Sequence, residues 1–195
     1  NQWFPLPSAL RERGAMTKSG GSVFVLVIGF LLTATPNSQA HLMAEQKGTL
    51  NVVDGGAFLV LSAPVSAFKG VDDNKDGALS TEELSNHLDH VKQQIYQGIQ
   101  LLSESGTSLP LRGLLLSLVH VDDNLSNPAT QIMALGRFAV KDYMASFNLG
   151  VTLQGKTPKE NKITITATRN GRSHKMVFTL DDDQHLLFPI NPLAQ

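Results

Sequence analysis

The chain has 195 residues, a length typical of a single domain. Hydrophobic residues make up 42% of it and charged residues 17%, which excludes a collagen-like, coiled-coil or wholly disordered chain. The 16 basic and 17 acidic residues give a net charge of −1, so the basic surface that nucleic-acid binding requires is lacking. There is no Cys, which excludes disulfides, thiol catalysis and thiolate metal sites.

The first 40 residues have the pattern of a leader. We interpret residues 1–15, which precede the first Met, as a non-native upstream extension. Residues 16–40 have a basic start at Lys18, an apolar run over 23–32 and small residues up to Ala40, as in a secretory signal peptide. The run of about ten residues is shorter than the roughly 20 that span a membrane. An uncleaved anchor is the alternative.

The mature chain, residues 41–195, is therefore expected to be secreted or periplasmic and free of the membrane after cleavage. It begins with a predicted hairpin, in which 49–53 and 57–61 flank the turn sequence Asp54-Gly55-Gly56. Further strands are predicted at 114–121, 132–140, 147–153, 163–168, 176–180 and 186–188. Their near-regular spacing, with turn signals such as Asn170-Gly171, predicts an antiparallel β-sandwich.

One amphipathic helix is predicted between these two groups of strands. Its apolar residues recur every three or four positions: Leu84, Leu88, Val91, Ile95, Ile99 and Leu102. The helix is expected to end at Ser105-Gly106-Thr107. The sequence thus predicts a mainly β (α+β) fold that carries a helical insertion at about residues 64–104.

Directly before this helix, residues 72–83 match the EF-hand calcium loop at every position of the pattern. Ca²⁺ takes six to eight oxygen ligands, and a tight loop turns alternate side chains toward its centre. The predicted ligands are Asp72, Asn74, Asp76, the backbone carbonyl of Ala78, Ser80 and Glu83. Gly77 would supply the sharp turn, at a φ that a Cβ would penalise.

The residues around the loop agree with this interpretation. Ser80-Thr81-Glu82-Glu83 is a capping box for the following helix, and Leu79 occupies the position that faces the core. Val65 and Phe68 are expected to pack from a short entering helix, which Gly70 makes irregular. The alternative is a solvated acidic turn, but the ligand spacing and the phase of the helix argue against it.

The loop and its flanks resemble EF-hand calcium-binding proteins, here a single hand of the secreted bacterial type. The resemblance implies a Ca²⁺ site with the ligands given above. EF-hands usually occur in pairs, and a second candidate beginning at Asp122 has Asn127 in place of the Gly and Met133 in place of the closing Glu. We interpret 122–127 as a hairpin loop. A lone hand is expected to bind Ca²⁺ modestly, at about 10⁻⁴–10⁻³ M, and to be structural.

The order of hairpin, loop, helix and further strands after Ala40-His41 is similar to the extracytoplasmic domain of hydrogenase/urease accessory proteins linked to nickel transport. This likeness of layout spans about residues 41–190. No multi-span membrane region follows in these 195 residues. We therefore carry over no transport role and expect at most a stand-alone relative of that soluble domain.

Histidines offer an alternative function, a copper- or nickel-handling accessory protein. Signal cleavage would leave His41 at the N-terminus, where its amine and imidazole together can chelate Cu²⁺. His87 and His90, three residues apart on the predicted helix, could share a metal. No nucleophile-elbow, zinc-protease or phosphate-loop motif is present, so no enzyme is expected. The sequence names no protein partner.

Overall fold

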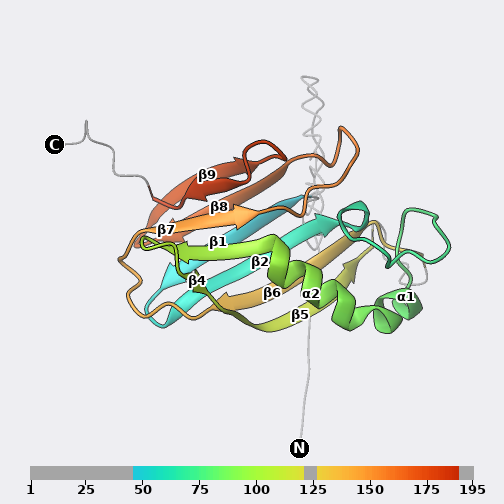
Figure 1. Cartoon of the computed structure of the whole chain (residues 1–195), viewed down its shortest axis with the longest axis horizontal. Helices are drawn as coiled ribbons and strands as arrows, with labels where there is room; N and C mark the ends of the chain where they lie inside the picture. The colour runs from blue at the N-terminus through green and yellow to red at the C-terminus, as the bar shows by residue number, and fades with distance from the viewer. Residues whose placement is uncertain (1–45, 121–126, 189–195) are drawn as a thin grey trace, which may run out of the picture. The chain divides into compact units, whose positions relative to one another are not determined.

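The computed structural model describes residues 46–120 and 127–188, which belong to one compact unit, residues 38–195. The predictions for the leader and for His41 lie outside the described residues. Within them the fold is mainly β, with two sheets and two α-helices (Figure 1). None of the helices in the described ranges has the length and apolar character that a membrane crossing needs.

The larger sheet has six strands in the order β5-β6-β2-β1-β8-β9. Its strands are β1 (Lys47–Val53), β2 (Gly56–Pro64), β5 (Leu111–Val119), β6 (Gln131–Phe138), β8 (Ile163–Arg169) and β9 (Arg172–Phe178). The smaller sheet has four strands in the order β10-β7-β3-β4. They are β3 (Ile99–Ser103), β4 (Ser108–Leu109), β7 (Phe147–Val151) and β10 (Gln184–Leu186). The strands predicted after residue 107 are thus confirmed.

Both predicted tight hairpins are present. β1 and β2 pair antiparallel, with Val53 opposite Gly56. β8 and β9 are joined by Asn170-Gly171, whose φ angles of 50° and 72° are the positive values that a type I′ turn requires. In each case the turn residues are adjacent in the chain, which is why the sequence alone could predict the hairpin. The first turn is one residue shorter than predicted, because Gly56 belongs to β2.

The expectation of a wholly antiparallel arrangement is wrong at one place. β1 lies parallel to β8, with Lys47 opposite Thr164 and Asn51 opposite Thr168. Parallel neighbours cannot be joined by a tight turn and need a long connection. β1 and β8 lie near the two ends of the described chain, so most of the other elements lie between them in sequence.

The single long helix predicted from the apolar stripe is interrupted. It consists of α1 (Thr81–Asn86) and α2 (Leu88–Gly98), with His87 between them at φ −107° and ψ 13°. Leu84 and Val91 still face the hydrophobic cluster, as the stripe predicts. The apolar spacing in the sequence therefore predicts correctly which face of the helices packs against the cluster. It does not predict the break between α1 and α2.

The predicted C-terminus of that helix is also wrong. α2 ends at Gly98, and Ile99 and Leu102 belong to β3. In β3, Ile99 and Leu101 are buried while Gln100 between them is exposed, which is the alternation of a strand. Gly is a poor helix former, and the helix changes to a strand at this residue. The regular spacing of apolar residues in the sequence, every three or four positions, did not reveal this change from helix to strand.

The entering helix predicted before the loop is reduced to one turn. It is the 3₁₀-helix η1 (Val65–Ala67), after which Phe68 is already extended, at φ −93° and ψ 137°. Val65 and Phe68 are both buried, as predicted. The Val65 backbone N–H donates to the Thr130 carbonyl at 2.9 Å, which holds this turn against the residues before β6.

One hydrophobic cluster joins the described elements. Both sheets and α2 contribute fully buried side chains to it, among them Leu50 of β1, Leu61 of β2, Ile95 of α2, Leu101 of β3 and Leu149 of β7. Figure 1 draws α2 and β7 over the strands of the larger sheet. The loop between η1 and α1 is anchored in this cluster by a buried apolar residue on each side of its polar segment.

Candidate metal centre

Residues 72–78, the first part of the predicted calcium loop, form a polar segment between two buried apolar residues. Val71 and Leu79 are both fully buried within the hydrophobic cluster, whereas residues 73–77 are exposed. The loop then leads directly into α1, near the right-hand edge of the molecule in Figure 1. The cluster therefore fixes the two ends of a polar segment, and this positions the side chains that lie between them.

Three of the predicted ligand side chains accept hydrogen bonds from the backbone of their own loop. Asp72 Oδ2 accepts from Gly77 N–H at 2.9 Å, and Asn74 Oδ1 accepts from Asp76 N–H at 2.9 Å. Asp76 Oδ1 accepts from Ala78 N–H at 2.8 Å. These bonds hold the three side chains over the turn. The bonds of Asn74 and Asp76 arise because Asn and Asp readily accept from the backbone N–H two residues ahead, whereas the Asp72 bond spans five residues and closes the turn at Gly77.

The turn itself requires left-handed backbone. Gly77 has φ +83°, as the sequence predicts, and a Cβ there would meet no atom within 4 Å. Lys75 also has a positive φ, +60°, which the sequence did not reveal. The need for Gly at position 77 is thus conformational and not a matter of space.

Glu83 is held by a capping box, as predicted. Its carboxylate accepts from the Ser80 backbone N–H at 2.9 Å and from the Ser80 hydroxyl at 2.8 Å. Ser80 Oγ in turn accepts from Glu83 N–H at 3.1 Å, and Asp73 N–H donates to Glu83 Oε1 at 3.1 Å. The backbone and hydroxyl of Ser80 hold the pKa of the Glu83 carboxyl below its ordinary value. The last predicted ligand is therefore a carboxylate kept in its ionised form.

One oxygen at this site lacks a protein partner. Asp72 Oδ1 is buried and accepts no hydrogen bond from residues 46–120 or 127–188, although Oδ2 of the same carboxylate accepts one. Leaving a charged acceptor buried without a partner costs free energy, on the order of 1–3 kcal/mol or more. A cation at this oxygen would supply the missing interaction.

The acidic side chains do not form a metal site by themselves. In the two described ranges, no group of three or more His, Asp or Glu side chains gathers as one that could hold a metal ion. A Ca²⁺ shell at this loop would therefore depend on its neutral oxygens as well: the Asn74 amide, the Ala78 carbonyl and the Ser80 hydroxyl. All three are oxygen ligands of the kind that this hard cation prefers.

The two helix histidines make separate contacts. His87 Nε2 lies 2.9 Å from each carboxylate oxygen of Asp73. His90 Nε2 lies 2.9 Å from the Lys69 carbonyl oxygen. The structure therefore does not bring the two imidazoles to a common point, and the Cu²⁺ or Ni²⁺ function stays a prediction that depends on His41.

A backbone contact that the sequence did not predict holds the loop against the chain before β6. Leu79 forms an isolated antiparallel bridge with Ala129, two residues before β6. Nothing in the segment Asn127-Pro128-Ala129-Thr130 has a recognisable strand pattern, so no sequence signal could have revealed it. The predicted hairpin loop over 122–127 lies almost wholly outside the described residues, but β5 and β6 pair antiparallel on either side of it.

Comparisons with known proteins do not assign this chain to a family. No protein-family model matches the chain, and no curated protein matches it. Any statement about the function of this loop therefore depends on its residues and their contacts.

Proposed function

We propose that this protein binds one Ca²⁺ through the single EF-hand loop of residues 72–83, and that the ion has a mainly structural role. The observation that carries the proposal is Asp72 Oδ1, a buried carboxylate oxygen without a protein partner at the first ligand position. A bound cation would satisfy this oxygen. It would also neutralise repulsion among the carboxylates of Asp72, Asp76 and Glu83.

The donor set fits calcium chemistry. The ligands would be Asp72, Asn74, Asp76, the carbonyl of Ala78, Ser80 and Glu83. Several of these oxygens already accept one N–H from the loop, but an oxygen has a second lone pair that can bind a cation. The hydrogen bonds would thus orient the ligands before the ion arrives, which lowers the ordering cost of binding.

We further propose that the two sheets pack as a β-sandwich with this loop and its helices inserted between β2 and β3. The shared buried cluster, to which Val71 and Leu79 contribute, supports both parts of this arrangement. The signal-peptide pattern of residues 16–40 supports a secreted or periplasmic location. At the millimolar Ca²⁺ of such compartments the ion would stay bound, which favours a structural role without enzymatic activity.

Calorimetric titration of the protein with CaCl₂ tests the proposal. Binding of one ion is expected, and Glu83→Gln should weaken it at least about tenfold, or 1.4 kcal/mol in binding free energy, because a charged ligand is removed. Glu82→Gln is the matched control, since Glu82 is the exposed neighbour at a non-ligand position. Equal losses in both variants, or no binding to the unchanged protein, would show that the loop is only an acidic turn.

A further inference from the structure

The outer face of the larger sheet is apolar over β5, β6 and β2. Leu115 lies opposite Leu135, and Leu135 lies opposite Val60, so the three side chains form one row across the strands. Leu115 is 68% exposed, and Phe58 on β2 is 46% exposed. The same row becomes polar at Thr49 of β1. An apolar area thus lies on this face across β5, β6 and β2.

Two arginines lie beside this apolar area. Arg112 of β5 lies directly opposite Arg137 of β6, and Arg137 lies opposite Phe58. The Arg137 guanidinium carbon is 5.9 Å from the centre of the Phe58 ring. Like charges on directly opposite strand residues are destabilising. A negatively charged partner would offset this repulsion.

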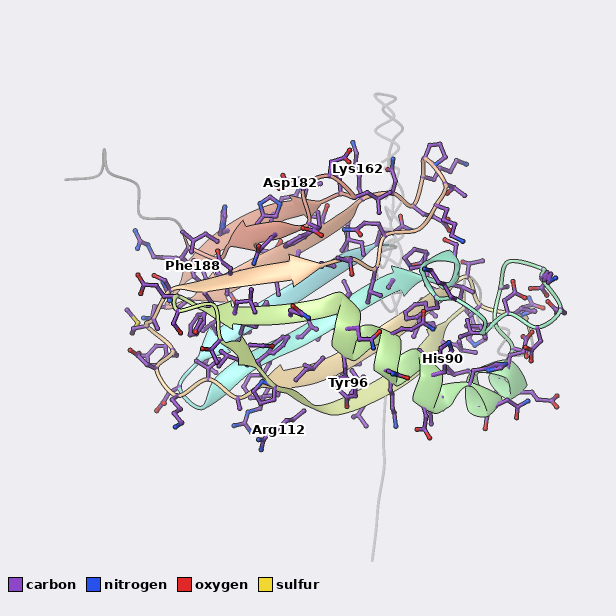
Figure 2. The ribbon with its side chains drawn as sticks, viewed as in Figure 1. His90, Tyr96, Arg112, Lys162, Asp182 and Phe188 are labelled. Atoms are coloured by element: carbon purple, nitrogen blue, oxygen red, sulfur yellow. The ribbon has the colours of Figure 1, made fainter. Side chains whose placement is uncertain are left out.

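No such partner is found in the described part of the chain. Arg137 donates to the Gly55 carbonyl oxygen through Nε at 3.0 Å and Nη2 at 2.6 Å, which satisfies donors but not its charge. Neither Arg112 nor Arg137 forms an ion pair with any described carboxylate. Arg112 extends from the edge strand β5 away from the ribbon (Figure 2). Two positive charges are thus presented together without an ion pair to any described residue.

A bulge opens the sheet at the same place. The β5–β6 register shifts between Arg112 and Leu115, and Gly113 within it has φ +64°. Bulges of this kind redirect neighbouring side chains and interrupt pairing. The result is a hollow of about 360 Å³ lined by side chains and backbone of Phe58, Val60, Arg112, Gly113, Leu135 and Arg137. The hollow is shallow and open to solvent, and its volume is at the lower end of the range of small-molecule sites, about 300–1,000 Å³.

We propose that this hollow binds a small amphiphilic anion, a carboxylate attached to an acyl chain. The two guanidinium groups would take the carboxylate, since Arg donors match the two oxygens of that group. Phe58, Val60 and Leu135 would cover the chain. The site lies at the opposite end of β6 from Ala129 and the loop of residues 72–83, so it does not depend on the proposed calcium function.

Titration of the full chain with dodecanoate, below its micelle concentration and followed by calorimetry, tests this proposal. Arg112→Gln should weaken binding roughly tenfold, as expected for loss of a charged hydrogen bond. The Arg112 side chain makes no hydrogen bond or ion pair with the described residues, so this variant should fold, which circular dichroism will check. Lys175→Gln is the control. Lys175 is an exposed cation on β9, at the far end of the cross-strand row that contains Leu135 and Val60, and its loss should leave binding unchanged.

Charge specificity gives a second, variant-free measurement. Dodecyltrimethylammonium has the same chain with a positive head group, and it should bind at least about tenfold more weakly than dodecanoate because the arginines repel it. Equal binding of the two amphiphiles would overturn the proposal, since the face would then be merely apolar. Absence of dodecanoate binding, or equal losses for Arg112→Gln and Lys175→Gln, would overturn it as well.

Discussion

Leu79 and Ala129 exchange two backbone hydrogen bonds, each of 2.8 Å, and both residues are fully buried. Leu79 N–H donates to the Ala129 carbonyl, and Ala129 N–H donates to the Leu79 carbonyl. The loop of residues 72–83 is thus joined to the chain just before β6. A lone EF-hand lacks the support of a second hand, and this bridge gives the proposed calcium loop a support of another kind.

Ala129→Pro is predicted to weaken both the fold and calcium binding. Proline removes the N–H that the Leu79 carbonyl accepts, and a buried carbonyl without a partner costs about 1–3 kcal/mol. Urea unfolding should show this loss of stability, and calorimetry should show a lower affinity for Ca²⁺. A lower unfolding free energy with unchanged Ca²⁺ affinity would mean that the bridge stabilises the sheet without supporting the loop.

Gly77→Ala is predicted to cost about 1–2 kcal/mol through backbone conformation alone. Gly77 has φ +83°, and a Cβ there would meet no atom within 4 Å. Gly106→Ala is a closely matched control, because Gly106 has φ +78° and equally open surroundings in the turn between β3 and β4. Both variants should lower the melting temperature, but Gly77→Ala alone should lower Ca²⁺ affinity. If both variants lower the Ca²⁺ affinity equally, the lower affinity reflects reduced global stability and not a change in the loop.

The features that the sequence predicted correctly are those encoded by neighbouring residues. The Asn170-Gly171 turn and the capping box of Ser80 and Glu83 each depend on side chains or φ preferences within four positions. Local chemistry of this kind is visible in a single sequence. The same is true of Gly77, whose left-handed backbone follows from its place in the loop pattern.

The features that the sequence did not reveal depend on distant partners. The parallel pairing of β1 with β8 and the Leu79–Ala129 bridge join segments far apart in the chain. Gly98, where the helix ends, packs closely on a residue far away in the chain, since a Cβ there would lie 2.6 Å from Leu153 Cδ2. None of these contacts leaves a periodic signal, because each is decided by which surfaces meet after folding.

Ser80→Ala is predicted to raise the pKa of the Glu83 carboxyl toward its ordinary value. The Ser80 backbone and hydroxyl bonds are the main reasons why that pKa is lowered, and alanine removes the hydroxyl. A lowered carboxyl pKa contributes stability that is present above the ordinary value, about 4.3, and is lost as the pH falls through the folded value. Ser80→Ala should therefore lose part of this contribution.

Titration of the Glu83 carboxyl by NMR in calcium-free buffer measures this effect. Ser85→Ala is the control, because Ser85 is an exposed serine on α1 that makes no hydrogen bond to Glu83. Ser85→Ala should give the same titration midpoint for the Glu83 carboxyl as the unchanged protein. An unaltered midpoint in Ser80→Ala would show that the hydroxyl does not hold the carboxylate as described.

Hydrogen exchange with and without Ca²⁺ is predicted to show where the ion acts. The carboxylates of Asp72, Asp76 and Glu83 repel one another without a cation, so the loop should loosen in its absence. At 100-fold excess over Kd, binding adds about 2.7 kcal/mol to the stability of the folded state. Protection should therefore rise over residues 66–92, which include the loop and the first turns of the helices.

The Leu79–Ala129 bridge extends this prediction to a second segment. Ala129 N–H donates into the loop, so its exchange should slow with that of Leu79 when Ca²⁺ binds. β8 and β9 make no such bond to the loop, and their amides should change little because the hydrophobic cluster holds them without the ion. Equal protection throughout would instead make Ca²⁺ a folding requirement of the whole unit. If Ca²⁺ changes the exchange of neither the Leu79 nor the Ala129 amide, the loop is an acidic turn that only its backbone hydrogen bonds hold in place.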